Sequence, residues 1–178
     1  MPHIELPEEL PGIRSLFAYR SDTGQLLSAL AETLLRKESP ISTQDRELIA
    51  AFVSHGNECL FCTNSHAAAS RELFGDRKEI VDQVLEDFRK APLSPKMKAL
   101  LEIAGKVREN GLHVTDKHIE DARNERATDR EIHDTVLIAA AFSMYNRYVD
   151  GLATRTPADG EIYKEMGKVL AEQGYQRK

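Results

Sequence analysis

The sequence predicts an all-α protein, folded as a single-domain antiparallel helical bundle. Apolar residues recur at three- and four-residue spacing along most of the chain, four segments open with helix-capping patterns, and strand patterns are nearly absent. The length of 178 residues suits one domain, and no Gly/Ser- or Pro-rich linker divides it. We therefore expect one domain over residues 1–178, with an irregular N-terminal segment over about residues 1–20, where three prolines fall.

The first half of the chain predicts four helices. The first has leucines at helical spacing over residues 26–35. The second opens with the capping-box-like pattern Ser42-Thr43-Gln44-Asp45 and closes at Gly56. The third begins after Asn57, which we expect to be its N-cap, and continues to about residue 73. The fourth covers residues 80–88, where apolar residues again follow the helical period.

The second half predicts four more helices. Ser94-Pro95 supplies an N-cap and a proline at the first helical position, and Gly111 ends that helix. Thr115-Asp116 and Thr128-Asp129 start two others, each with acidic residues in the first turn, where they complement the helix dipole. A last helix is expected from Ala158 to about Gln173.

Composition excludes several classes of function. The chain has 24 basic and 29 acidic side chains, a net charge of −5, which disfavours nucleic acid as a partner because phosphate binding requires a basic face. The longest apolar run, residues 136–142, is far shorter than the ~20 residues of a membrane span. No signal-peptide pattern opens the sequence, and two cysteines cannot staple a secreted scaffold. We therefore expect a cytoplasmic protein that does not bind membranes.

The two cysteines stand in a pattern that carries chemistry. Cys59, Cys62 and His66 occupy positions i, i+3 and i+7 of a segment that reads as helix. Helix geometry separates the two cysteine Cα atoms by roughly 5 Å, which is within the range of a disulfide. His66 lies one turn beyond Cys62 on the same face, and its side chain leans back toward Cys62. An imidazole beside a thiol favours a thiolate at neutral pH.

The residues alone do not decide which cysteine forms the thiolate. With Asn57 as N-cap, Cys59 falls in the first helical turn, where the helix dipole lowers a thiol pKa. The spacing to His66 instead favours Cys62. Glu47 joins this group because Glu47 and His66 are equally far from the expected turn at Gly56-Asn57. If the two helices pack antiparallel, its carboxylate can orient the imidazole or accept its proton.

Plainer interpretations compete with a redox pair. The cysteines can be small core residues, and Glu47 can be a solvated acid near a helix start. Cys, His and Glu are also zinc ligands, but structural zinc usually takes its four ligands from separate segments with a second Cys or His pair, and none is present. His55 can lie near the site or face solvent, and the latter is favoured. The pairs Asp45-Arg46 and Asn146-Arg147 are expected to make buried polar contacts.

The pattern Glu47-x11-Cys59-x-x-Cys62-x3-His66 resembles the signature of the AhpD-like alkylhydroperoxidases, in the carboxymuconolactone decarboxylase superfamily. Further marks resemble the peroxidase-related branch and extend from Pro11 to about Leu152. They are Pro11-Gly12-Ile13, Leu16-Phe17-Ala18-Tyr19-Arg20, Asp45-Arg46-Glu47-Leu48-Ile49-Ala50, Ser54, Asn57, Asn146-Arg147 and Asp150-Gly151-Leu152. Some members have His before the second cysteine, where this chain has Phe61. The decarboxylase branch lacks the cysteine pair.

The resemblance implies an AhpD-like helical fold, a homo-oligomer (dimer, trimer or hexamer) and thiol-based peroxide reduction. It implies that Cys62 is the peroxidatic cysteine, that Cys59 resolves, and that His66 and Glu47 form the proton relay. The function expected is reduction of hydrogen peroxide or an organic hydroperoxide without a cofactor or metal. An external dithiol, on a lipoyl or thioredoxin-type protein, would restore the thiols. The alternatives are a protein thiol–disulfide oxidoreductase and a zinc- or partner-binding helical module.

Overall fold

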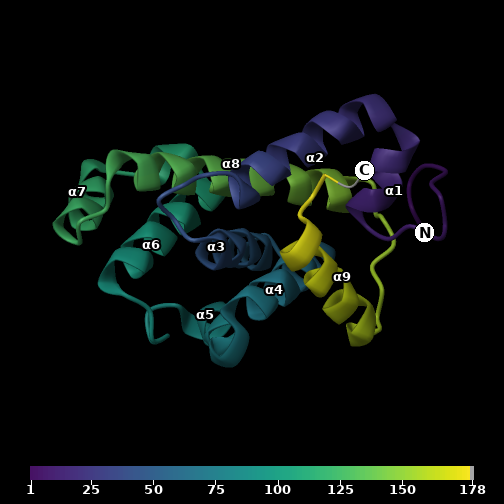
Figure 1. Cartoon of the computed structure of the whole chain (residues 1–178). Helices are drawn as coiled ribbons and strands as arrows, with labels where there is room; N and C mark the ends of the chain where they lie inside the picture. Colours follow the sequence, from purple (N-terminus) through teal and green to yellow (C-terminus); the bar gives the residue numbers. More distant parts are fainter. Residues whose placement is uncertain (177–178) are drawn as a thin grey trace.

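The computed structural model describes residues 1–176, and every regular element in that range is a helix (Figure 1). This confirms the predicted all-α fold class. Residues 177 and 178, the end of the expected domain, lie outside the described residues. The α-helices are α1 (Ile13–Tyr19), α2 (Ser21–Arg36), α3 (Thr43–Gly56), α4 (Leu60–Phe74), α5 (Glu79–Asp87), α6 (Pro95–Glu109), α7 (Asp116–Asn124), α8 (Asp129–Gly151) and α9 (Gly160–Gln173).

Helix α3 is the centre of the bundle. It packs against α2, α4, α5, α6 and α8, and eight of its 14 residues are buried. Its run Leu48–Ala51 is fully enclosed, which is what an apolar surface around the whole helix requires. Two polar side chains, Arg46 and Glu47, are buried in the same helix. Arg46 donates to the carbonyl oxygens of Leu34 and Lys37, at 2.9 Å each, as expected for a paired buried group.

The predicted helix starts are found where the capping residues stand. Ser42 and Ser94 accept hydrogen bonds from the backbone amides three residues later, both at 3.2 Å. Thr115 and Thr128 both form capping boxes. The last helix begins at Gly160 with Asp159 as N-cap, two residues after the expected start. These side chains satisfy backbone N–H groups that the helix itself leaves free.

Three expectations about local structure were wrong. The segment 1–20 is not irregular throughout, because Ile13–Tyr19 forms α1. The helix before Gly111 ends already at Glu109, and Gly111–His113 is a separate 3-10 turn. Asn57 follows the end of α3 and is not the N-cap of α4; that position belongs to Cys59. Glu58 between them has φ of 61°, which breaks the chain direction before α4 begins.

The two ends of the described chain pack around one side of α4. Helix α9 runs close to α4, and a Cβ on Gly167 would come within 2.6 Å of Ala68. The N-terminal segment bonds to the loop after α8, through His3 N–H to Leu152 O (3.0 Å) and Gly12 N–H to Arg155 O (2.9 Å). Figure 1 shows α1, α9 and the N-terminus at one end of the molecule and α7 at the other.

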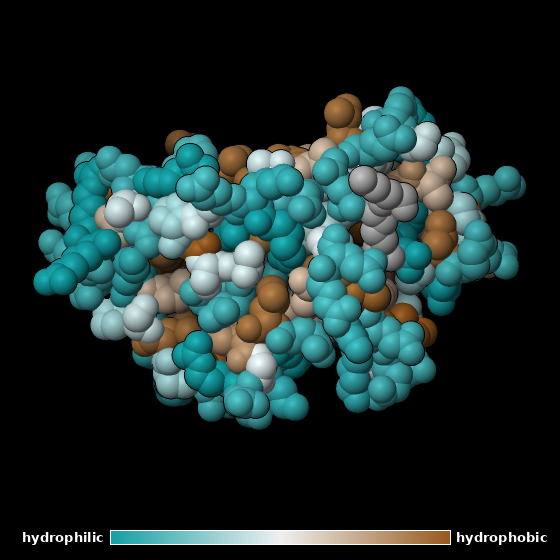
Figure 2. All heavy atoms as spheres, in the orientation of Figure 1, coloured by the Kyte–Doolittle hydropathy of each residue, from teal (hydrophilic) through white to brown (hydrophobic). Residues whose placement is uncertain are grey.

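The surface agrees with the acidic, polar composition. Figure 2 shows hydrophilic side chains over most of one face, with hydrophobic residues in recesses between them and at a few places along the edge. Within residues 1–176, no helix is both long and apolar enough to cross a membrane.

Candidate functional site

The two cysteines stand at the start of α4. Cys59 is the N-cap, and its carbonyl oxygen accepts the first helical hydrogen bond from Thr63 N–H at 2.9 Å. Cys62 therefore lies in the first turn of the helix, three residues after the N-cap. The dipole argument that favoured Cys59 depended on Asn57 as N-cap, and it now favours Cys62, because the positive end of the helix lies there.

Both cysteines are free thiols and both are buried. The exposed fraction is 0% for Cys59 and 3% for Cys62. They belong to a small apolar cluster that includes Leu16, Phe61 and Val149, separate from the main core. Contact with the Cys62 thiol, followed by burial, raises the pKa of Cys59 well above its usual value. Cys59 thus holds its proton and is suited to donate a hydrogen bond to the sulfur of Cys62.

Asp150, near the end of α8, is the acidic residue whose pKa is influenced by Cys59. Burial raises the pKa of Asp150, and the bond with Cys59 opposes this rise in part. The same end of α8 is tied to the turn before Cys59, since Asn57 donates to Asn146 at 2.9 Å.

His66 and Glu47 form a buried hydrogen-bonded pair. Nδ1 of His66 lies 2.8 Å from Oε2 of Glu47, because α3 and α4 pack side by side around the turn that joins them. An ionised carboxylate only accepts, so Nδ1 carries the hydrogen and Nε2 is the free acceptor of the neutral ring. Phe142 packs edge-on against the imidazole, with ring centroids 4.6 Å apart.

Two residues that sequence reasoning missed complete the surroundings of Glu47. Arg36, the last residue of α2, donates to Oε1 of Glu47 at 2.6 Å and to Leu170 O of α9 at 2.9 Å. The Tyr175 hydroxyl donates to the same Oε1 at 2.5 Å and lies 3.1 Å from Nδ1 of His66. Nothing local in the sequence marks either residue, since they lie 11 and 128 positions from Glu47.

These contacts decide the charge of Glu47. Burial alone would raise the pKa of its carboxyl, but the hydrogen bond and charge of His66, the charge of Arg36 and the Tyr175 hydroxyl together lower it. Glu47 is therefore ionised at neutral pH, with both oxygens accepting. Burial, then the charge of Glu47, raises the pKa of Tyr175, so the phenol remains a donor.

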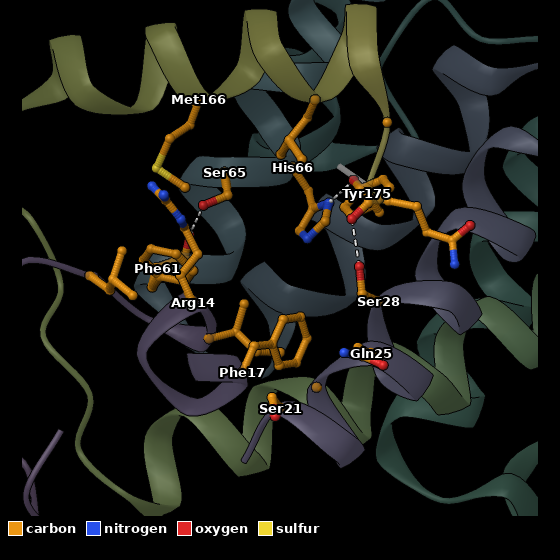
Figure 3. A pocket seen from close by; sticks show the side chains of 16 residues that line it. Arg14, Phe17, Ser21, Gln25, Ser28, Phe61, Ser65, His66, Met166 and Tyr175 are labelled. Atoms are coloured by element: carbon orange, nitrogen blue, oxygen red, sulfur yellow. Dashed lines mark hydrogen bonds between the residues drawn. The ribbon is translucent and has the colours of Figure 1, made fainter. Parts of the chain in front are cut away.

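The site opens to solvent through one cavity of about 660 Å³. His66, Phe61 and Tyr175 line it, whereas neither cysteine does (Figure 3). Within the described residues, His66 hydrogen bonds to Glu47 and Tyr175 but to neither sulfur. The structure therefore joins Glu47 to His66 and Cys59 to Cys62, with both pairs on or against α4.

The remaining candidates lie elsewhere. His55 is exposed at the end of α3 and lines a shallow groove with Phe88 and Arg108, away from the cysteines. In residues 1–176, no three His, Cys, Asp or Glu side chains are grouped so as to hold a metal ion. The zinc-binding alternative therefore has no ligand set in the part of the chain that the structure describes.

Comparisons with known proteins show which family and which solved structures this chain is similar to. Residues 21–87 match the sequence model of the carboxymuconolactone decarboxylase family. A crystal structure described as an alkylhydroperoxidase AhpD core, a peroxidase-related protein from Ralstonia eutropha, is 26% identical over 95% of this chain and 96% of its own, with a TM-score of 0.78. No curated protein shows a significant sequence match to the chain.

Two further solved structures share the fold at lower identity. A peroxidase-related protein from a Silicibacter species is 24% identical, with a TM-score of 0.80 and coverage of 92% of this chain and 94% of its own. An Agrobacterium tumefaciens protein described as a putative antioxidant defence protein AhpD is 21% identical, with a TM-score of 0.70 and coverage of 89% and 100%.

The fold and the paired thiols beside a buried carboxylate–imidazole pair define the class as that of AhpD-type helical proteins. Over residues 21–87 the chain is similar to the carboxymuconolactone decarboxylase family, and its fold is that of the AhpD-like peroxidase-related structures.

Proposed function

We propose that the protein is a thiol-dependent peroxidase that reduces hydrogen peroxide or an organic hydroperoxide. The observation that carries this proposal is the position of Cys62. It lies in the first turn of α4, next to a Cys59 thiol that holds its proton, and one turn before an imidazole fixed by an ionised carboxylate. A helix start and a neighbouring thiol donor both favour a thiolate on Cys62.

The proposed reaction uses the two cysteines, His66 and Glu47 of the protein, together with one external reductant. His66 takes the Cys62 proton through Nε2, and the thiolate attacks the outer peroxide oxygen. The O–O bond breaks, Cys62 becomes a sulfenic acid, and the leaving alkoxide or hydroxide takes the proton back from His66. The Cys59 thiol then attacks the Cys62 sulfur, forming the disulfide and releasing water. Glu47 stabilises the imidazolium throughout.

Burial of the thiols favours a small oxidant over a protein disulfide. Thiol–disulfide exchange with a partner protein requires the partner's sulfur to approach in line, and exposed fractions of 0% and 3% leave no surface for that. Hydrogen peroxide and slender hydroperoxides do not have this restriction. We therefore favour peroxide reduction over protein thiol–disulfide exchange as the function of this protein.

The disulfide is returned to two thiols by an external dithiol, which is oxidised in turn. A lipoyl-type dithiol on a flexible arm suits buried cysteines better than the flat active surface of a thioredoxin-type protein. Such a cycle requires a reducing compartment, so we place the protein in the cytoplasm, as a homo-oligomer.

The test is peroxide consumption by the purified protein with a small dithiol as reductant. We expect turnover in the wild type, loss of it in Cys62→Ser, and a stalled, sulfenic acid-bearing enzyme in Cys59→Ser. Intact mass after peroxide should fall by two hydrogens as two free thiols per chain disappear. Full activity in Cys62→Ser would overturn the proposal.

A further inference from the structure

The cavity that reaches His66 is built from the two ends of the chain. It lies between α1 and α2 on one side and α4, α9 and the segment after α9 on the other (Figure 3). Its volume of about 660 Å³ falls within the range of pockets that hold small organic molecules. Hydrogen peroxide needs no cavity of this size, and the volume has room for a larger ligand.

Most of the wall is apolar. Phe17 comes from α1, Phe61 from α4 and Met166 from α9, and they are joined by Leu10, Ile13 and Leu170. Phe61 is held against the backbone of Gly12, where φ is 54° and an added Cβ would lie 2.2 Å from the ring. Its ring therefore has one fixed position between the cavity and the cysteine cluster.

The charged side chains among the described residues that line the cavity are basic, not acidic. Of the lining residues within 1–176, only Arg14 and His66 can be cationic and none is Asp or Glu, in a chain that carries 29 acidic side chains and a net charge of −5. Among residues 1–176, no carboxylate forms an ion pair with Arg14. Figure 3 shows the Arg14 side chain extending from α1 toward Met166 on α9.

We propose that this cavity binds an amphipathic carboxylate, such as a medium-chain fatty acid, with its carboxylate on Arg14 and its hydrocarbon part along Phe17, Phe61 and Met166. A guanidinium holds a carboxylate by two parallel hydrogen bonds, which a neutral head group cannot reproduce. The apolar wall removes the hydrocarbon part from water. Arg14 thus determines the class of ligand, and the apolar wall sets its length.

This inference deepens the proposed function, and one part of it rests on that function. If the protein is a peroxidase, the carboxylate-bearing ligand is its substrate as the corresponding hydroperoxide. The O–O group then lies on the hydrocarbon part that extends toward His66. Binding of the unreactive acid does not depend on the thiol chemistry, so the two claims can be tested apart.

The binding experiment uses the full chain, without peroxide or reductant, and isothermal titration with decanoate and with decanol as its neutral match. We expect decanoate to bind at least about fivefold more tightly than decanol, and Arg14→Gln to remove that preference. Arg147→Gln is the matched control, because Arg147 is exposed and, within residues 1–176, its side chain bonds only to Ser143 O of the same helix, at 2.8 Å. Higher salt should weaken decanoate binding and leave decanol unchanged.

Each outcome bears on one claim. Equal affinity for the acid and the alcohol, or an unchanged preference in Arg14→Gln, overturns the assignment of the cavity, whatever the peroxidase assay gives. If the protein prefers decanoate but consumes no peroxide, the proposal that the cavity binds a carboxylate is supported and the proposed peroxidase function is rejected. If both hold, kcat/KM should favour a fatty acid hydroperoxide over its methyl ester by a similar factor, and Arg14→Gln should abolish the difference.

Discussion

The hydroxyl of Tyr175 donates to Oε1 of Glu47 at 2.5 Å, although 128 positions of the chain separate the two residues. The backbone holds the tyrosine there as well. Its N–H donates to Glu32 at 2.8 Å, and its carbonyl oxygen accepts from Ser28 at 2.5 Å. The segment after α9 therefore docks onto α2 and places a phenol over the carboxylate–imidazole pair.

Replacing that phenol should weaken the pair without breaking it. Tyr175→Phe removes one of two donors to Oε1 of Glu47, so the pKa of the carboxyl rises and the carboxylate that orients His66 is ionised over a narrower pH range. We expect a roughly tenfold lower peroxidase rate and an acid limb of the pH–rate profile moved to higher pH. Tyr145→Phe is the matched control, because in the described part of the chain its hydroxyl bonds only to Leu27 O, at 2.8 Å. An unchanged pH profile in Tyr175→Phe would contradict this role.

Glu47 also makes stability depend on pH. Its pKa in the folded protein is lowered, so its contribution is complete above the unfolded value of about 4.3 and is lost as pH falls through the folded value. Glu47→Gln should cost about 2–3 kcal/mol in the free energy of unfolding at pH 7, because Arg36 and His66 lose their carboxylate. Urea unfolding at pH 7 and below pH 4 measures both effects. The wild type and the variant should converge in acid, and a constant difference would contradict the assignment.

The thiols should differ in reactivity when each is alone. Cys62 lies in the first helical turn, whereas burial is among the causes that raise the pKa of Cys59. We expect Cys59→Ser, which keeps Cys62, to be alkylated by iodoacetamide at least about tenfold faster at pH 7 than Cys62→Ser. Rates followed by intact mass over pH 6–10 report this directly. The reverse order would assign the thiolate to Cys59.

We expect that a residue larger than glycine at position 12 destabilises the packing beside the cysteines. The residue has φ of 54°, and an added Cβ would lie 2.2 Å from the Phe61 ring. Gly12→Ala should therefore lower the free energy of unfolding by about 2–3 kcal/mol, from backbone strain and displacement of the ring. Gly160→Ala is a fair comparison, since nothing lies within 4 Å of its added Cβ. Equal stability of the two variants in urea would contradict the packing.

Local rules accounted for most of the fold. Serine and threonine caps marked the starts of α3, α6, α7 and α8, because capping depends only on residues within one turn. The pairing of Glu47 with His66 also followed from local reasoning, since two helices joined by a short turn bring equidistant residues to the same height.

Other features depend on contacts that no local pattern carries. The N-cap moved from Asn57 to Cys59 because Glu58 adopts a positive φ, which glycine or asparagine would have signalled better than glutamate. Helix α1 is short and lies among prolines and a glycine, so its apolar pattern was hidden. Arg36 and Tyr175 reach Glu47 only after α2, α3 and α9 have packed together.

The Arg36 guanidinium bonds both to Glu47 of α3 and to Leu170 O of α9, and Tyr175 follows directly after α9. The surroundings of the carboxylate are thus assembled from an early part and a late part of the chain. During synthesis, the cysteines leave the ribosome more than a hundred residues before Tyr175 does. A growing chain therefore carries two thiols whose relay is incomplete, and the site gains its full set of contacts only once the segment after α9 has been made and has docked.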